Sequence, residues 1–187
     1  MSESPKVYHT DQGKGFPVVL LHGFCETHEV WSRFAKVLSK DFRVINVDLP
    51  GFGKSKSLPE GFSVNDAATA VNELIADLGI TSCIPIGHSL GGYVTLGMVK
   101  QKPSLFSAFG LFHSTAYADS EERKASRNKV IEFVSNHGVA PFIETFIPPL
   151  FYNKAHPDIP FAVTMALQTR QETLIGYAKA MRDRPDL

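Results

Sequence analysis

Residues 83–95 read Cys-Ile-Pro-Ile-Gly-His-Ser-Leu-Gly-Gly-Tyr-Val-Thr, and this stretch decides the fold. The apolar run 83–86 predicts a short buried strand, and the residues from Leu90 onward predict a helix. Between them, Gly87-His88-Ser89-Leu90-Gly91 matches the pattern G-x-S-x-G in the strand–turn–helix setting that the pattern requires. A turn this tight predicts a positive φ at Ser89. Gly87 and Gly91 leave room for the strand and helix backbones to pass close to Ser89, whose hydroxyl at a helix N-terminus is a candidate nucleophile.

The rest of the first 114 residues alternates between strand and helix patterns. Apolar runs predict four further strands, at 6–10, 18–21, 42–47 and 106–112, of which all but the first are expected to be buried. Helical spacing of apolar residues predicts helices over 31–38 and over 63–78, the second with Ser63 and Asp66 as a capping box and Gly79 as its end. This order predicts an α/β protein with a mostly parallel sheet and helices on both faces.

After residue 114 the strand patterns end. An acidic first turn at 119–122 predicts a helix that continues to Gly138, with Val130, Ile131, Phe133 and Val134 on one face. Two more helices are expected over 161–170 and 171–182, after an aromatic stretch at 139–151. The sequence therefore predicts a core at 1–114 and an all-helical unit at 115–187.

Composition predicts an ordinary soluble globular protein. Of 187 residues, 43% are apolar and 20% charged, and the formal net charge is zero, so nothing favours binding to nucleic acid or to an anionic membrane. There is no apolar run of about 18 residues and no signal-peptide pattern at the N-terminus. Cys25 and Cys83 fall in or beside apolar strand runs, which favours buried free thiols and a cytoplasmic protein.

Two short patterns resemble ligand-binding motifs but lack essential residues. The segment 51–55, Gly-Phe-Gly-Lys-Ser, resembles the end of a phosphate-binding loop, yet Asp48 stands where the first glycine is required. His28-Glu29 resembles the start of a zinc-protease helix, yet Ser32 stands where the second histidine is required. We therefore expect no metal and no cofactor.

Four features in order along the chain resemble the α/β-hydrolase fold family. They are the strand followed by His22-Gly23-Phe24, then Trp31, then the loop 48–55, and then the turn around Ser89. Within that family the chain is most similar to small-substrate esterases, enol-lactonases and carbon–carbon bond hydrolases that carry a helical cap. The helical unit 115–187 resembles this cap.

The resemblance assigns roles to individual residues. It implies that Ser89 is the nucleophile, and that the backbone N–H groups of Phe24 and Leu90 form the oxyanion hole. Gly23 would let its loop approach the substrate carbonyl, with His22 and His88 orienting loops by hydrogen bonds. The residues Asp48 to Gly51 match a structural turn. The side chains Phe142, Phe146, Phe151 and Met165 are expected either to line an acyl pocket or to form the cap's own core.

The sequence departs from the family pattern at its C-terminal end. In the family an acid and then a histidine follow the nucleophile on later strands, whereas this sequence ends at Leu187 with neither and with both later strands missing. His113 is a candidate substitute base. Two interpretations remain open: the N-terminal part of a serine hydrolase, inactive alone, that acts on an ester, thioester or lactone through an acyl-serine, or a non-catalytic binding module with a hydrolase-like shell. A serine nucleophile argues against the epoxide hydrolase and haloalkane dehalogenase chemistry that this fold carries out with an aspartate. In either interpretation the uncharged strand 106–112 is expected to become a sheet edge that promotes self-association.

Overall fold

The computed structural model describes residues 6–187, and a five-stranded sheet forms its centre. In sequence order the strands are β1 (His9–Gln12), β2 (Pro17–Leu21), β3 (Arg43–Val47), β4 (Ile84–His88) and β5 (Gly110–Phe112). In space the order is β1-β3-β2-β4-β5, with β1 antiparallel to β3 and every other pair parallel. The mostly parallel sheet expected from the sequence is confirmed.

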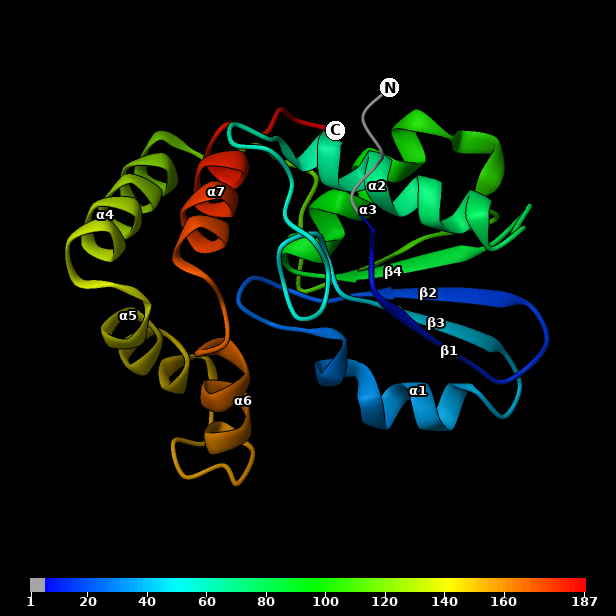
Figure 1. Cartoon of the computed structure of the whole chain (residues 1–187), viewed down its shortest axis with the longest axis horizontal. Coiled ribbons are helices and arrows are strands. Elements are labelled where there is room, and N and C mark those ends of the chain that lie inside the picture. Colours follow the sequence, from blue (N-terminus) through cyan, green and yellow to red (C-terminus); the bar gives the residue numbers. More distant parts are fainter. Residues whose placement is uncertain (1–5) are drawn as a thin grey trace.

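Helices cover both faces of the sheet, as expected (Figure 1). The 3₁₀ turn η1 (His28–Trp31) and α1 (Ser32–Leu38) lie on one face, while α2 (Val64–Asp77) and α3 (Leu90–Gln101) lie on the other. Alternate side chains of β2 divide between the two: Leu20 packs in a cluster with Trp31, whereas Leu21 belongs to the larger core that includes α2 and α3. Burial on both sides explains why the strand reads as a continuous apolar run.

Local signals set the ends of α2. The Ser63 hydroxyl accepts from the Asp66 N–H at 3.3 Å, and the Ser63 N–H donates to the Asp66 carboxylate at 2.8 Å, which completes the expected capping box. Gly79 follows the helix with φ 66°, a conformation that favours glycine. Both ends of this helix were therefore predicted from the sequence.

Beyond β5 the described residues form helices only. These are α4 (Glu121–His137), α5 (Val139–Phe146), α6 (Ile159–Ala166) and α7 (Gln171–Arg182), with short 3₁₀ turns η2 (Pro103–Leu105) before β5 and η3 (Pro148–Leu150) after α5. They gather on one side of the molecule, beside the sheet and its covering helices (Figure 1). Within residues 6–187, no helix combines the length and apolar character that crossing a membrane would require.

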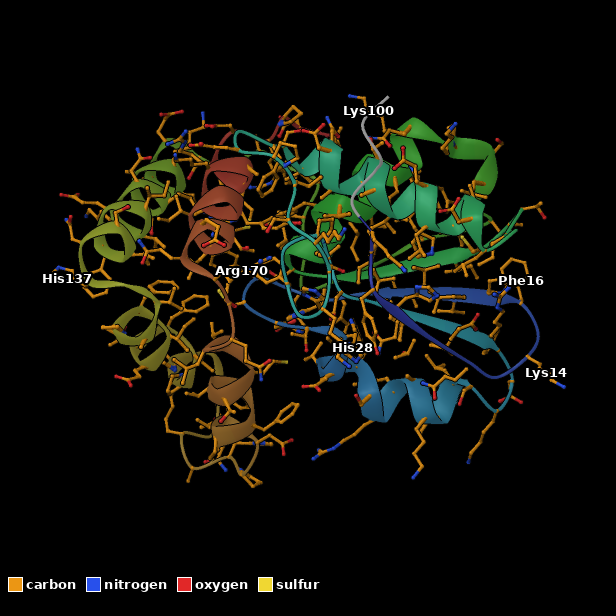
Figure 2. The ribbon with its side chains drawn as sticks, viewed as in Figure 1. Lys14, Phe16, His28, Lys100, His137 and Arg170 are labelled. Carbon is orange, nitrogen blue, oxygen red and sulfur yellow. The ribbon has the colours of Figure 1, made fainter. Side chains whose placement is uncertain are left out.

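Helix α7 packs the helical unit onto the core. The Tyr177 ring lies 4.9 Å from Phe52 and 4.7 Å from Phe62, measured between ring centroids. Arg170, just before α7, donates to Ser57 Oγ at 2.7 Å and to the Gly51 carbonyl at 3.3 Å, and Figure 2 shows it beside the loop that follows β3. Core and helical unit thus share one hydrophobic cluster.

Three expectations about individual elements need correction. The first strand is shifted, since β1 spans His9–Gln12 and not 6–10, and its pairing with β3 extends to Asp11 and Gln12. The strand expected over 106–112 is reduced to β5, with an isolated bridge at Phe106. Its expected position at the sheet edge is confirmed, but the burial predicted from its apolar run is wrong, since Phe109 is 48% and Phe112 45% exposed. On α4, Phe133 is 39% exposed and only Val134 of the expected face is fully buried.

Candidate active site

Ser89 occupies the turn between β4 and α3 with φ 49° and ψ −112°, so the positive φ expected from the sequence is present. Its N–H donates to the Phe112 carbonyl at 3.0 Å, and its carbonyl accepts from the Ser114 hydroxyl at 2.8 Å and from the Gly92 N–H at 2.9 Å. A non-glycine residue at positive φ persists only where its surroundings determine it. Here neighbouring backbone and a serine from beyond β5 hold the peptide groups on both sides of Ser89.

The glycines around Ser89 are required by close backbone approach. A Cβ at Gly91 would lie 2.5 Å from the Leu21 carbonyl oxygen and 2.6 Å from that of His22, and a Cβ at Gly87 would collide with the Gly91 backbone. These obstacles are main-chain atoms, which cannot rotate away. The pattern G-x-S-x-G therefore marks the point where α3 crosses the ends of β2 and β4.

His22 holds the loop after β2. The Leu49 N–H donates to His22 Nε2 at 2.9 Å, so Nδ1 carries the proton and donates to the Gly23 carbonyl at 2.8 Å. The ring is fully buried, and this burial lowers the pKa of His22. Both ring nitrogens of the neutral imidazole are thus engaged, and they connect the loop after β2 to the loop after β3.

The backbone N–H groups of Phe24 and Leu90 have no acceptor among the described residues. Leu90 is the first residue of α3, so its N–H has no intrahelical acceptor. In the part of the chain that the structure describes, neither the Leu90 N–H nor the Phe24 N–H donates to another protein group. After Phe24 the backbone turns sharply, since Cys25 has φ 59°.

Ser89 lines a cleft of about 960 Å³ between the core and the helical unit. The core contributes Phe24, His88, Ser89 and His113 to its lining. From the helical unit, Phe146, Phe151 and Met165 line it together with other apolar side chains. Phe142 does not line the cleft; it is buried behind Phe146, with the two rings stacked at 4.9 Å. Three of the four side chains thus line the cleft, and Phe142 belongs to the buried core.

An ion pair joins the two sides of this cleft. Arg33 on α1 binds Asp158, just before α6, through two hydrogen bonds of 2.9 and 3.0 Å, and both residues line the cleft. They lie 125 positions apart in the sequence. No local pattern indicates such a pair, and the sequence analysis missed it.

Glu26 is a second residue of the site that the sequence analysis missed. Its Oε2 accepts from the Gly23 N–H at 2.6 Å and lies 2.9 Å from His88 Nδ1. The residues that the sequence placed at the site, from Gly23 to Leu90, are thus brought together by the fold, and Glu26 connects their two loops. A glutamate four residues after a histidine carries no signal of its own.

The remaining candidate groups lie elsewhere. A second cavity of about 710 Å³ lies between α7 and the residues around Phe62, and Ser89 is not among its lining residues. Within residues 6–187 no group of three histidine, cysteine or carboxylate side chains is placed to hold a metal ion. Cys25 and Cys83 are both buried free thiols, and burial raises the pKa of both, that of Cys83 to about 11.

This fold, with its strained serine between β4 and α3, matches a known family. The family model described as "alpha/beta hydrolase fold" matches residues 17–128, which is more than half of the chain. The chain belongs to the α/β-hydrolase fold family.

Two curated relatives are named as hydrolases, and one similar solved structure is an esterase. The chain is 28% identical over 125 residues to the (E)-2-((N-methylformamido)methylene)succinate hydrolase of Acinetobacter baylyi, and 37% identical over 89 residues to a soluble epoxide hydrolase of a Corynebacterium species. These matches cover 67% and 48% of the chain but only 48% and 31% of the two relatives. A thermophilic esterase from Thermogutta terrifontis is similar in structure, with a TM-score of 0.89 and 31% identity over 97% of this chain and 69% of that one. The chain therefore spans less than half the length of the two curated relatives.

Proposed function

We propose that Ser89 is the nucleophile of a serine hydrolase that acts on small carboxylic esters, thioesters or lactones. The observation that carries the proposal is the backbone of Ser89, held at φ 49° at the start of α3 and facing the cleft. Residues 1–114 would supply the nucleophile, and the helical unit 115–187 would close over the acyl group as a cap. The buried free thiols of Cys25 and Cys83 support a reducing, cytoplasmic setting.

The reaction would proceed through an acyl-serine. Ser89 Oγ forms a bond to the substrate carbonyl carbon, and the carbonyl electron pair moves onto oxygen. The N–H groups of Phe24 and Leu90, which have no protein acceptor within residues 6–187, would donate to this oxyanion. Collapse expels the alcohol or thiol, which takes up the proton that Oγ gave to a base, and water then releases the acid in the same way.

The reaction needs a general base that takes the proton from the Ser89 hydroxyl. Among the described histidines, His88 and His113 line the cleft, and His88 Nδ1 is already engaged with Glu26. No histidine nitrogen within residues 6–187 hydrogen-bonds to Ser89 Oγ. A serine hydroxyl without a base is a weak nucleophile, so we expect the 187-residue chain to acylate slowly.

Acylation by p-nitrophenyl acetate tests the proposal. We expect slow release of p-nitrophenol and one acetyl group on Ser89, located by peptide mass spectrometry, and both should be lost in Ser89→Ala. Ser126→Ala, which removes an exposed hydroxyl from α4, serves as the control and should behave like the unmodified chain. Fast turnover that is lost in both Ser89→Ala and His113→Gln would identify His113 as the base.

The same assay separates catalysis from binding. A non-catalytic module with a hydrolase-like shell would release p-nitrophenol at the same rate with and without the Ser89 hydroxyl. In that outcome the acetyl group would be found on scattered lysines, and the nucleophile assignment would be wrong.

A further inference from the structure

We propose that Glu26 is a positioning residue for the oxyanion hole, fixing the loop that carries Phe24 against the turn that carries Ser89 and Leu90. The inference rests on the proposed function and deepens it. It assigns to one carboxylate the relative placement of the two N–H donors.

One oxygen of Glu26 makes both contacts. Oε2 accepts from the Gly23 N–H at 2.6 Å and lies 2.9 Å from His88 Nδ1. Gly23 directly precedes Phe24, and His88 directly precedes Ser89 in the turn that leads to Leu90. The carboxylate therefore ties together two backbone segments that are 62 positions apart, each next to one proposed donor.

The loop is shaped to bring this side chain back onto Gly23. The Glu26 N–H donates to the Gly23 carbonyl at 3.3 Å, and the turn between them passes through Cys25 at φ 59°. A Cβ on Gly23 would lie 2.9 Å from both Glu26 Oε2 and His88 Nδ1. A side chain at position 23 would therefore displace these two groups from their present contact, so glycine at this position favours the Glu26–His88 contact as well as access of substrate to the loop.

Other contacts of the loop already orient the Phe24 N–H, so the Glu26 side chain affects a different property of this group. The Gly23 carbonyl belongs to the same planar peptide unit as the Phe24 N–H, and it is held by His22 Nδ1 and by the Glu26 backbone. The direction of the Phe24 N–H is thus set without the Glu26 side chain. The distance of that peptide from the Ser89 turn is set through Oε2 and His88, where a carboxylate makes hydrogen bonds stronger than neutral ones.

Removing the carboxylate should loosen one donor relative to the other without unfolding the loop. Transition-state stabilisation depends on donors fixed where charge develops, so such loosening slows the chemical step more than it weakens ground-state binding. Glu26→Ala removes both contacts. Glu26→Gln keeps an acceptor oxygen at nearly the same place and should rescue part of the effect.

Amide exchange tests the contact itself. In the ¹⁵N-labelled chain we expect the Gly23 N–H to be protected from exchange, and Glu26→Ala to reduce this protection about tenfold or more, the effect of losing a hydrogen bond to a charged group. Glu73→Ala removes an exposed carboxylate from α2, away from the loop and the cleft, and should leave the Gly23 amide unchanged. Unchanged Gly23 exchange in Glu26→Ala would overturn the inference.

Labelling by a fluorophosphonate tests the consequence, because its phosphoryl oxygen takes the place of the oxyanion. We expect the second-order rate constant for Ser89 labelling, followed by intact mass, to fall about tenfold or more in Glu26→Ala and less in Glu26→Gln. In the control Glu73→Ala it should stay within about twofold. The apparent affinity for the probe before labelling should change far less than the labelling step.

The outcomes distinguish the two claims. Labelling that persists in Ser89→Ala contradicts the proposed function. Labelling confined to Ser89 with an undiminished rate in Glu26→Ala overturns the positioning role and leaves the proposed function standing. If the chain is not labelled at Ser89 at all, the proposed function fails, and the exchange of Gly23 alone decides whether Glu26 holds the loop. If Glu26→Ala loses its circular dichroism signal, amide exchange and Ser89 labelling are both measured on Glu26→Gln instead.

Discussion

The hydroxyl of Tyr177 donates to the Pro50 carbonyl oxygen at 2.9 Å in a fully buried hydrogen bond between α7 and the loop after β3. Burial raises the pKa of the Tyr177 phenol, so the group remains a neutral donor at any working pH. A few residues earlier on α7, Thr173 Oγ1 donates to the Gly51 carbonyl at 3.2 Å. Two side chains of α7 thus donate to neighbouring carbonyl groups of one turn in the core, in addition to the contacts of Arg170 and the Tyr177 ring.

The substitution Tyr177→Phe should destabilise the protein by about 1–3 kcal/mol, because it leaves the buried Pro50 carbonyl without its donor while the ring packing is kept. Urea unfolding monitored by circular dichroism measures this. Tyr152→Phe is the control, since the Tyr152 side chain is fully exposed and its loss of a hydroxyl should change nothing. Equal midpoints for the two variants would show that the Pro50 carbonyl finds another partner.

Two glycines on α3 provide a matched test of the close approach at the turn. Both Gly91→Ala and Gly97→Ala improve helix propensity by up to about 1 kcal/mol. At Gly91 the new methyl would lie 2.5 Å from a backbone carbonyl oxygen, whereas at Gly97 its nearest neighbour would be the Ala68 side chain at 3.0 Å. We expect Gly91→Ala to cost about 2–3 kcal/mol of unfolding free energy and Gly97→Ala to lie within about 1 kcal/mol of the unmodified chain. Similar values for both would mean that α3 shifts away from β2 without strain.

His22 should make stability fall in mild acid. Its pKa is lowered in the folded state by burial, so the unfolded chain binds the proton first. The contribution is complete above the unfolded pKa of about 6.5 and is lost as pH falls below it, by at most about 1.4 kcal/mol per pH unit until the folded pKa is reached. Denaturant midpoints between about pH 7 and about pH 5 should therefore fall less steeply in His22→Gln than in the unmodified chain. The exposed His137, on the outer side of the helical unit in Figure 2, provides the control His137→Gln, which should keep the original slope.

What the sequence predicts well is local. The strand, the turn at Ser89 and the helix are consecutive in the chain, and the positive φ follows from the tightness of that turn. The capping box of α2 is equally local, since Ser63 and Asp66 stand three positions apart. Such elements were predicted because the residues that determine them lie within a few positions of one another.

What the sequence did not predict depends on distant partners. Glu26 acquires its role only when His88, 62 positions away, is brought against it, and Arg33 acquires its partner 125 positions away. From the apolar run alone, Phe109 and Phe112 are predicted to be buried, because such a run is the same for a central strand and for an edge strand. The edge position of this strand was expected only from the two later strands that the family pattern has and this sequence lacks. Burial is decided by what lies on the outer side of β5, and that information is not in the run itself.

The two edges of the sheet lead to a prediction about association. The β1 edge carries Asp11, whose carboxylate binds Arg43 at 2.7 Å, so a charged pair protects it. The β5 edge reads Gly-Leu-Phe, with Leu111 36% and Phe112 45% exposed and no charge. An uncharged apolar edge is a template for pairing with a second copy.

We expect the 187-residue chain to self-associate at micromolar concentration through β5, and Leu111→Lys to suppress this because the added charge opposes strand pairing at the edge. Light scattering coupled to size-exclusion chromatography measures the mass. Leu150→Lys is the matched control, because Leu150 is 64% exposed on η3, outside the sheet, and should leave association unchanged. A monomer before any substitution would show that the β5 edge does not pair, and suppression by both lysines alike would place the contact on general apolar surface and not on the strand edge.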